Sequence, residues 1–275
     1  MLKKVVLSLL ILYLVGAVAL NSPLFSLCVI SPSRKIDPAR FDVIQGAQKQ
    51  RFIVRSGTEK LEAWFFAVKG SKSLAVVHHG RGGNLYNKAF LAQQLIDRKL
   101  SVVVYDYCGY GASSGPASLS SFNRDALAVH DFSSDKFGFA PLKTVIVGES
   151  IGTGPACVVA SQRECAGLFL QAPFTSLPQE AKSCVPLLHV YPDWLFPQPS
   201  FENIKYVRGK HPPLLIVHGA KDNQIPVSHA KALFEAATQP KTLVILPNAG
   251  HRNVGGADPE QFGKALTQFL SEIKN

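Results

Sequence analysis

The sequence of 275 residues is poor in charged residues and in cysteine. Charged residues make up 17% and hydrophobic residues 47% of the chain, so there is ample apolar surface to bury and a disordered chain is excluded. Glycine and proline follow no short period and heptads are absent, which excludes collagen and coiled coils. The five cysteines form no C-x-x-C pair and predict no zinc site. We expect buried or idle thiols, with a single bridge such as Cys165–Cys184 as the alternative.

Basic residues outnumber acidic residues by 29 to 19, which gives a formal net charge of +10. The lysines and arginines are scattered, no run is longer than a pair, and no helix face is basic. We therefore expect no nucleic-acid partner. Attraction to an anionic membrane surface fits the charge better, because the chain begins with an apolar segment.

Residues 1–30 form this apolar leader. Lys3 and Lys4 precede a run from Val5 to Leu20 that only Ser8 interrupts. A basic start, an apolar stretch and small residues are the parts of a secretory signal peptide. An uncleaved N-terminal membrane anchor, that is, a transmembrane helix, is the alternative that we favour slightly. In either case the remaining chain is exported, membrane-anchored or periplasmic, because lysines stay on the cytoplasmic side.

From residue 52 onward, short apolar runs alternate with longer helix-like segments. The first two runs read as antiparallel strands joined by a turn at Ser56-Gly57. The alternation predicts an α/β fold with a mostly parallel sheet and helices on both faces. The expected strands are residues 52–54, 61–68, 74–78, 102–105, 144–147, 168–170, 214–217 and 243–246.

Residues 174–206 break this alternation with five prolines and several large apolar side chains. Prolines at this density divide a helix into short pieces. Long irregular inserts in compact domains are usually functional or disordered, and this one is too apolar for disorder. We predict a small helical cap over the open end of the sheet, within one catalytic domain at residues 31–275.

Residues 148–152 form the pattern G-x-S-x-G around Ser150. A buried strand precedes the pattern and a helix-like stretch follows it. This is the context of a nucleophile elbow, in which a sharp turn presents a serine hydroxyl at the end of a sheet. The alternative is a tight turn with a helix-capping serine. We predict that Ser150 is a nucleophile.

A serine hydroxyl needs a base, and the base needs an acid that holds its tautomer. In this kind of fold the acid follows the serine in the chain and the histidine comes last. Asp222 and His251 lie in loops after successive predicted strands. All three residues would meet at the carboxyl ends of parallel strands, where open α/β sheets bind ligands.

An oxyanion formed at this site needs N–H donors. The backbone N–H of Ile151 is one candidate, and the glycine-rich loop after residue 78 supplies the other, with Arg81 as our choice and Gly82 second. The sequence contains no H-E-x-x-H, no G-x-G-x-x-G and no G-x-x-x-x-G-K-[ST] motif. We therefore expect no metal and no cofactor.

Five motifs in order resemble the α/β-hydrolase superfamily: His79-Gly80, Asp106 to Gly115, Gly148 to Gly152, His218 to Asp222, and Gly250-His251. More narrowly, the chain resembles short-cap serine-aminopeptidase-like hydrolases and abhydrolase-domain protein depalmitoylases, over residues 61–270. The resemblance implies an α/β-hydrolase fold with an eight-stranded-type sheet, and Ser150, Asp222 and His251 as a catalytic triad. Arg81 and Cys108 depart from the residues usual in these relatives, and the cysteine-rich amino terminus of the depalmitoylases is missing.

We expect a monomeric serine hydrolase that cleaves esters or thioesters of small-molecule or lipid-like acyl groups. Trp194 and Phe196 of the cap are candidate substrate-binding residues, because large apolar side chains suit an acyl pocket. The alternatives are a peptidase or amidase, an acyltransferase on the same triad, and a catalytically silent binding module.

Overall fold

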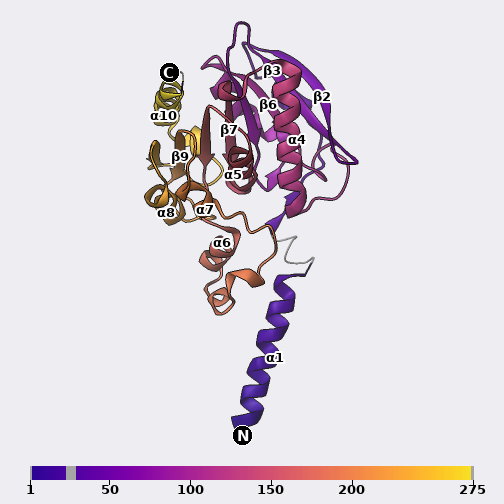
Figure 1. Ribbon diagram of the computed structural model, residues 1–275, viewed down its shortest axis with the longest axis vertical. Helices are drawn as coiled ribbons and strands as arrows, with labels where there is room; N and C mark the ends of the chain where they lie inside the picture. Colours follow the sequence, from indigo (N-terminus) through magenta and orange to yellow (C-terminus); the bar gives the residue numbers. More distant parts are fainter. Residues whose placement is uncertain (1, 23–28, 274–275) are drawn as a thin grey trace.

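The computed structural model describes residues 2–22 and 29–273. Its centre is a sheet in the order β10-β9-β8-β7-β4-β6-β3-β2 (Figure 1). β2 pairs antiparallel with β3, β3 pairs antiparallel with β6, and the other pairings of this sheet are parallel. The predicted mostly parallel, eight-stranded sheet is confirmed. The strands are β2 (Gln48–Ser56), β3 (Glu59–Ala67), β4 (Leu74–His78), β6 (Ser101–Tyr105), β7 (Thr144–Glu149), β8 (Gly167–Gln171), β9 (Leu214–Gly219) and β10 (Lys241–Leu246). Short strands β1 (Ser31–Pro32) and β5 (Gly82–Gly83) pair separately.

Helices cover both faces of this sheet, as predicted. One face packs against α3, α9 and α10, and the other packs against α4, α5 and α8. The helices are α3 (Ala89–Ile96), α4 (Leu119–Phe137), α5 (Thr153–Gln162), α8 (Ser228–Ala236), α9 (Val254–Ala257) and α10 (Pro259–Glu272). Short 3-10 helices are η1 (Pro38–Phe41), η2 (Leu85–Lys88), η3 (Pro141–Lys143) and η4 (Ser150–Gly152).

The central strands are buried along nearly their whole length. Every residue of β4, β6, β8 and β9 is buried. Helices on both faces exclude water from such strands, so their sequences show no polar alternation. β2 lies at the edge of the sheet and exposes most of its side chains, which is why its sequence is rich in lysine, arginine and glutamine.

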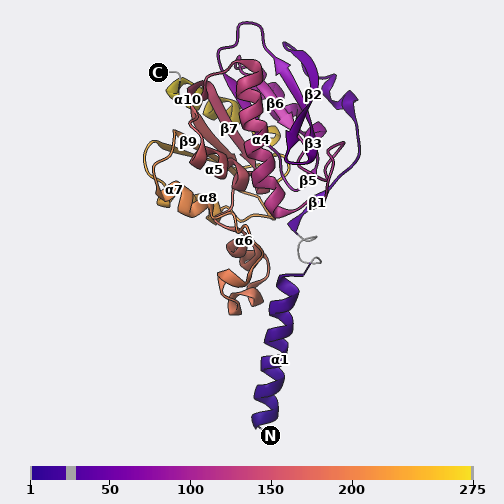
Figure 2. The same ribbon diagram turned by 45° about the vertical axis from the view of Figure 1, so that its right-hand side comes forward.

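The chain between β8 and β9 leaves the sheet and forms a separate lobe below it (Figures 1 and 2). We call residues 177–196 the cap lobe. It contains α6 (Leu177–Cys184) and two 3-10 turns, η5 (Pro186–Val190) and η6 (Asp193–Leu195), before α7 (Asn203–Arg208) returns to the sheet. Pro178 and Pro186 each lie in the first turn of the helix that they begin, where the missing N–H is not needed.

Helix α1 (Leu2–Leu20) extends away from the domain, and the C-terminal part of the helix packs against the cap lobe (Figure 2). The ring of Tyr13 stacks on that of Tyr191, with the centroids 4.8 Å apart. The Asn21 side chain donates a hydrogen bond to the Leu195 carbonyl oxygen over 2.6 Å. Leu20 is buried in a small apolar cluster with Tyr191, so the leader is attached to the cap by packing as well as by the chain.

The structure bears on the two alternatives weighed for the leader and for the cysteines. Among the residues that the structure describes, no helix combines the length and apolar character needed to cross a membrane, so the transmembrane alternative is not found. Cys165 and Cys184 are both free thiols, so the alternative bridge between them is absent. Cys28 lies outside the described residues.

Candidate active site

Ser150 lies at a sharp turn between a strand and a helix. β7 ends one residue earlier, η4 and α5 follow at once, and the φ angle of Ser150 is 54°, a strained value for a residue with a side chain. A Cβ at Gly148 would lie 2.7 Å from the Thr153 Cα, and one at Gly152 would lie 2.1 Å from the His78 carbonyl oxygen. The turn therefore needs both glycines of the G-x-S-x-G pattern.

Asp222 and His251 lie beside this serine. Asp222 follows β9 and His251 follows β10, so both come from the same edge of the sheet as Ser150. The His251 Nε2 atom lies 3.0 Å from the Ser150 Oγ atom, and the His251 Nδ1 atom lies 2.8 Å from the Asp222 Oδ2 atom. The structure thus brings together the three side chains selected from the sequence, in the order that proton transfer requires.

The Asp222 side chain is fully buried and surrounded by donors. Its Oδ1 atom accepts hydrogen bonds from the backbone N–H groups of Gln224, over 2.9 Å, and Ile225, over 2.8 Å. Burial alone would raise the pKa of Asp222, but hydrogen bonds from His218, His251 and the Ile225 N–H hold this pKa well below its usual range. The carboxylate is therefore ionised and can orient the imidazole of His251.

His218 supports this carboxylate, and the sequence analysis did not assign it. Its side chain is fully buried, and its Nε2 atom lies 3.2 Å from the Asp222 Oδ2 atom and 2.9 Å from the Ile225 carbonyl oxygen. Both neighbours accept hydrogen bonds, so the Nε2 atom of His218 carries the proton. The one signal for this role was a histidine inside a buried strand, four residues before the acid.

The loop after β4 approaches the nucleophile closely. A Cβ at Gly80 would lie 3.3 Å from the Ser150 Cβ, so a larger residue would push the loop away. Arg81 and Ile151 border the same pocket as Ser150 and His251. The two residues whose backbone N–H groups were predicted to hold an oxyanion therefore both line the space in front of Ser150.

Buried polar groups hold this loop in place. The Asp106 Oδ1 atom accepts a hydrogen bond from the Leu85 N–H over 2.7 Å and lies 3.3 Å from the His79 Nε2 atom. The Tyr110 hydroxyl donates to the Arg81 carbonyl oxygen over 2.9 Å. The Arg81 carbonyl shares a peptide plane with the Gly82 N–H, so this bond fixes the direction of that N–H, the second candidate donor.

Comparison with known proteins places the chain in a family. Residues 76–198 match the family model for the alpha/beta hydrolase fold. An uncharacterized protein of Mycobacterium tuberculosis is 33% identical over 215 residues, which cover 78% of this chain and 75% of that protein. The chain belongs to the α/β-hydrolase fold family. This confirms the resemblance seen in the motifs.

Other α/β-hydrolases are similar over smaller or more divergent stretches. Human alpha/beta hydrolase domain-containing protein 17B is 33% identical over 62% of this chain and 57% of that protein. A solved structure of an esterase from Pyrococcus furiosus has a TM-score of 0.72 at 17% identity, covering 89% of this chain and 98% of the esterase. The esterase therefore shares the fold of this chain.

A partly buried ion pair, not foreseen from the sequence, adjoins the nucleophile of this α/β-hydrolase. The Lys88 Nζ atom lies 2.7 Å and 2.6 Å from the two carboxylate oxygens of Glu149. Burial raises the pKa of Glu149, but the charge of Lys88 outweighs burial, and the pKa is lowered. The pair links the residue before Ser150 to η2, the 3-10 helix that follows the loop after β4.

The space in front of Ser150 is a pocket of about 400 Å³. Much of its wall is apolar, and the cap lobe contributes Leu177, Ala181, Val185 and Leu188 to it. Polar groups, among them Glu180, Asn223 and Gln224, share the lining with Arg81. An apolar wall with a few polar groups is the usual form of a small-molecule site.

Trp194 and Phe196, the predicted substrate-binding residues, are not part of this lining. Trp194 points outward and is 76% exposed. Phe196 is buried in the cluster with Leu20 and Tyr191, beneath the Lys182 ammonium group. The prediction was wrong because it counted apolar residues in the cap, whereas the face that each residue presents depends on short turns without a regular period.

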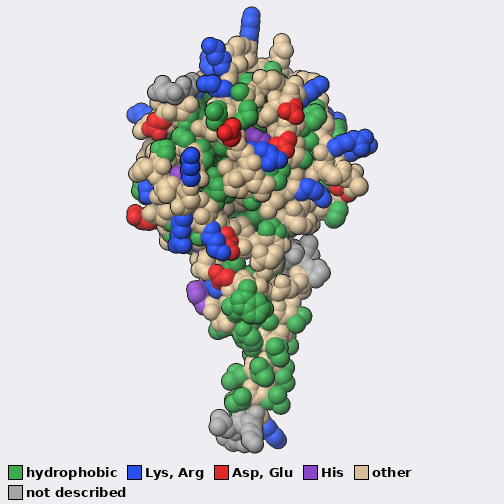
Figure 3. Space-filling model, in the orientation of Figure 1, with side chains coloured by type: hydrophobic (Ala, Val, Ile, Leu, Met, Phe, Trp, Pro, Cys, Tyr) green, Lys and Arg blue, Asp and Glu red, His purple; other side chains and the backbone are tan. Residues whose placement is uncertain are grey.

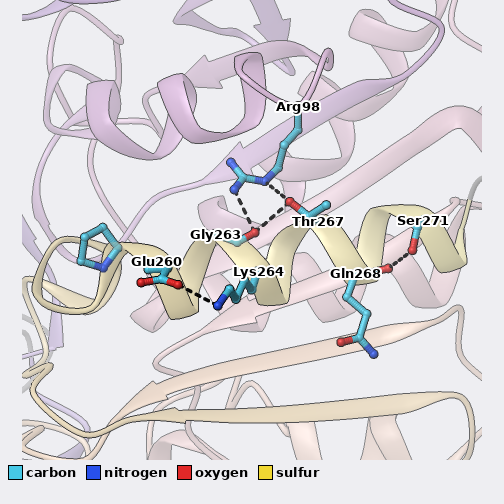
Figure 4. Close-up of a pocket in the computed structure, with 8 residues that line it drawn as sticks. Arg98, Glu260, Gly263, Lys264, Thr267, Gln268 and Ser271 are labelled. Atoms are coloured by element: carbon cyan, nitrogen blue, oxygen red, sulfur yellow. Dashed lines mark hydrogen bonds and ion pairs between the residues drawn. The ribbon is translucent and has the colours of Figure 1, made fainter.

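A second pocket lies on the outer side of α10, away from the triad (Figure 4). Its polar groups are paired within the protein: Arg98 donates to Thr267 and to the Gly263 carbonyl oxygen, and Lys264 pairs with Glu260. Within the described part of the chain, no group of three or more His, Cys, Asp or Glu side chains is placed to hold a metal ion.

Proposed function

We propose that this α/β-hydrolase cleaves carboxylic esters or thioesters through an acyl-enzyme formed on Ser150. The observation that carries the proposal is the continuous contact from Ser150 through His251 to the buried Asp222 carboxylate. Asp222 and its hydrogen bonds keep a proton on the Nδ1 atom of His251, so the Nε2 atom that faces the serine can accept one.

The first half of the reaction transfers the acyl group. The Ser150 Oγ atom attacks the carbonyl carbon of the substrate while His251 Nε2 takes the hydroxyl proton. The carbonyl oxygen becomes an oxyanion, which the backbone N–H groups of Ile151 and Arg81 stabilise. When the oxyanion collapses, the bond to the leaving alcohol or thiol breaks, and His251 returns the proton to the leaving group.

The second half is hydrolysis of the acyl-enzyme. His251 takes a proton from water, and the resulting hydroxide attacks the acyl carbon. The bond to Ser150 then breaks, and the proton on His251 passes to the serine oxygen. A carboxylic acid leaves, and the free enzyme is restored.

The pocket supports acyl groups as substrates. Leu177, Val185 and Leu188 provide apolar contacts near the serine, and burying apolar surface of an acyl chain gives about 25 cal/mol per Å². The likeness in fold to an esterase points in the same direction. The leaving group, an alcohol for an ester or a thiol for a thioester, would lie between His251 and the solvent.

The decisive experiment is labelling with a fluorophosphonate, which reacts only with an activated serine. We expect the wild-type chain to be labelled and Ser150→Ala to remain unlabelled. Ser161→Ala is the matched control, since Ser161 is exposed in α5 and bonds only to its own helix at the Val158 carbonyl. Labelling that survives Ser150→Ala would place the chemistry elsewhere, and an unlabelled wild type would indicate a binding module.

A further inference from the structure

Helix α1 exposes apolar side chains on every side. Ten of its valine, leucine and isoleucine side chains are each more than half exposed. Leu9, Leu10, Ile11 and Leu12 are consecutive members of this set, and successive residues of an α-helix are about 100° apart. They therefore point in all directions around the axis. A helix that is apolar all round requires an apolar environment all round, which a partner protein with one docking face does not provide.

The cap lobe continues this surface. Leu187 is 75% exposed and Trp194 is 76% exposed, and Val190 is also exposed. Figure 3 shows the hydrophobic side chains of α1 and of the lobe beside it as one nearly unbroken area, while charged side chains gather on the domain above. The stacking of Tyr13 on Tyr191 joins the two parts, so the surface is continuous from α1 to the lobe.

The same surface adjoins the mouth of the catalytic pocket. Val185 lines the pocket and is also 49% exposed. Leu188 lines the pocket, whereas its neighbour Leu187 faces outward. An acyl chain can therefore pass from the outer surface of the cap lobe into the pocket without leaving apolar contact.

The side chains at the tip of the cap lobe fit the boundary of a membrane. Within the cap lobe, Lys182 and Asp193 pair with each other. The exposed Trp194 suits the boundary between lipid headgroups and hydrocarbon.

We propose that α1 inserts into the apolar layer of a lipid bilayer while the tip of the cap lobe lies at its surface, and that the enzyme draws its acyl substrate from that bilayer through the pocket mouth at Val185 and Leu188. The substrate part of this inference rests on the proposed hydrolase function. It narrows the substrate class to lipid-borne acyl esters or thioesters.

The test uses the full chain and vesicles of phosphatidylcholine and phosphatidylglycerol in equal parts. We expect the wild type to float with the vesicles, and Leu187→Ser to need about tenfold more lipid for the same bound fraction, because one leucine leaves the apolar phase. Leu187→Ser combined with Trp194→Ser should weaken binding further. Leu142→Ser is the matched control: Leu142 is 60% exposed in η3, which precedes β7 at the opposite edge of the sheet.

Activity is measured in parallel on a soluble short-chain ester and on a long-chain acyl ester held in the same vesicles. Leu187→Ser should slow only the vesicle-borne ester. Equal binding by Leu187→Ser and Leu142→Ser would overturn the proposal. A wild-type chain that does not bind vesicles would also overturn it. The same holds if the wild type forms a dimer without lipid and Leu187→Ser dissociates that dimer. Vesicle binding that depends on Leu187 supports lipid contact whether or not the esters are cleaved. Failure to cleave either ester would contradict the proposed hydrolase function instead.

Discussion

The catalytic edge of the sheet and the cap lobe differ in what holds their side chains in place. Ser150, Asp222 and His251 each follow directly from a strand of the sheet, and hydrogen bonds to buried groups fix them. The cap lobe is built from one short helix and two 3-10 turns, and its side chains divide between the pocket, a small core and the solvent. The difference suggests that the edge determines which bond is broken, whereas the lobe determines which acyl group reaches it.

The largest expected effect separates these roles most sharply. His251→Ala should lower the rate of ester hydrolysis by about 10⁶-fold, because removal of a triad base leaves the serine without a proton acceptor. The measurement is the turnover of a soluble short-chain ester. His189→Ala is the control, since His189 is exposed in the cap lobe and bonds locally to the Pro186 carbonyl. Comparable losses in the two variants would contradict the division between edge and lobe.

The next effect tests the strained turn beneath Ser150. Gly152→Ala should reduce the free energy of unfolding by about 1–3 kcal/mol, because its Cβ would press on the His78 carbonyl oxygen, 2.1 Å away. Gly256→Ala is the control: a Cβ there would have no atom within 4 Å, so this substitution should not lower the free energy of unfolding. Denaturant unfolding measures both, and equal stabilities would show that the turn tolerates a side chain.

The pH dependence tests which group titrates at the edge. Because the pKa of Asp222 is held well below its usual range, Asp222 stays ionised as the pH falls through the region where imidazoles gain a proton. The acid limb of the pH–rate profile should therefore have the slope for a single proton, tenfold per pH unit, because Asp222 adds no second proton. A twofold steeper acid limb would show that the carboxylate titrates together with the imidazole.

The smallest effect sharpens the role of the lobe. Leu188→Phe should lower kcat/KM for long acyl esters by about tenfold relative to short ones, because a ring would occupy the pocket that Leu188 lines. The adjacent Leu187 faces outward. Leu187→Phe should therefore leave unchanged the ratio of kcat/KM for long to short soluble esters. If both substitutions shift the chain-length preference equally, the lobe does not select substrates through the pocket wall.

The sheet and the triad could be predicted from the sequence because buried parallel strands appear as uninterrupted apolar runs. β4, β7 and β9 are such runs, and the residues that follow them must lie at the same edge. Local rules were then enough to select Ser150, Asp222 and His251. The role of His218 could not be predicted, because a histidine within a buried strand cannot be told from a core residue until the structure places it beside Asp222.

The cap lobe could not be predicted at this level. Its 3-10 turns have no hydrophobic period long enough to show which side chains face inward, so Trp194 and Phe196 were assigned to a pocket that Leu188 and Val185 line instead. The pairing of Lys88 with Glu149 was equally invisible, because the two residues are 61 positions apart and meet only after the sheet has formed.

The most direct test of the account is the mass of the enzyme during turnover. The wild-type chain is mixed with an activated ester, the reaction is quenched in acid, and the protein is digested and analysed by mass spectrometry. We predict an added acyl mass on the peptide that contains Ser150, and no such mass in Ser150→Ala. Turnover without any acyl adduct, or an adduct on another residue, would contradict the central claim that Ser150 carries the acyl group.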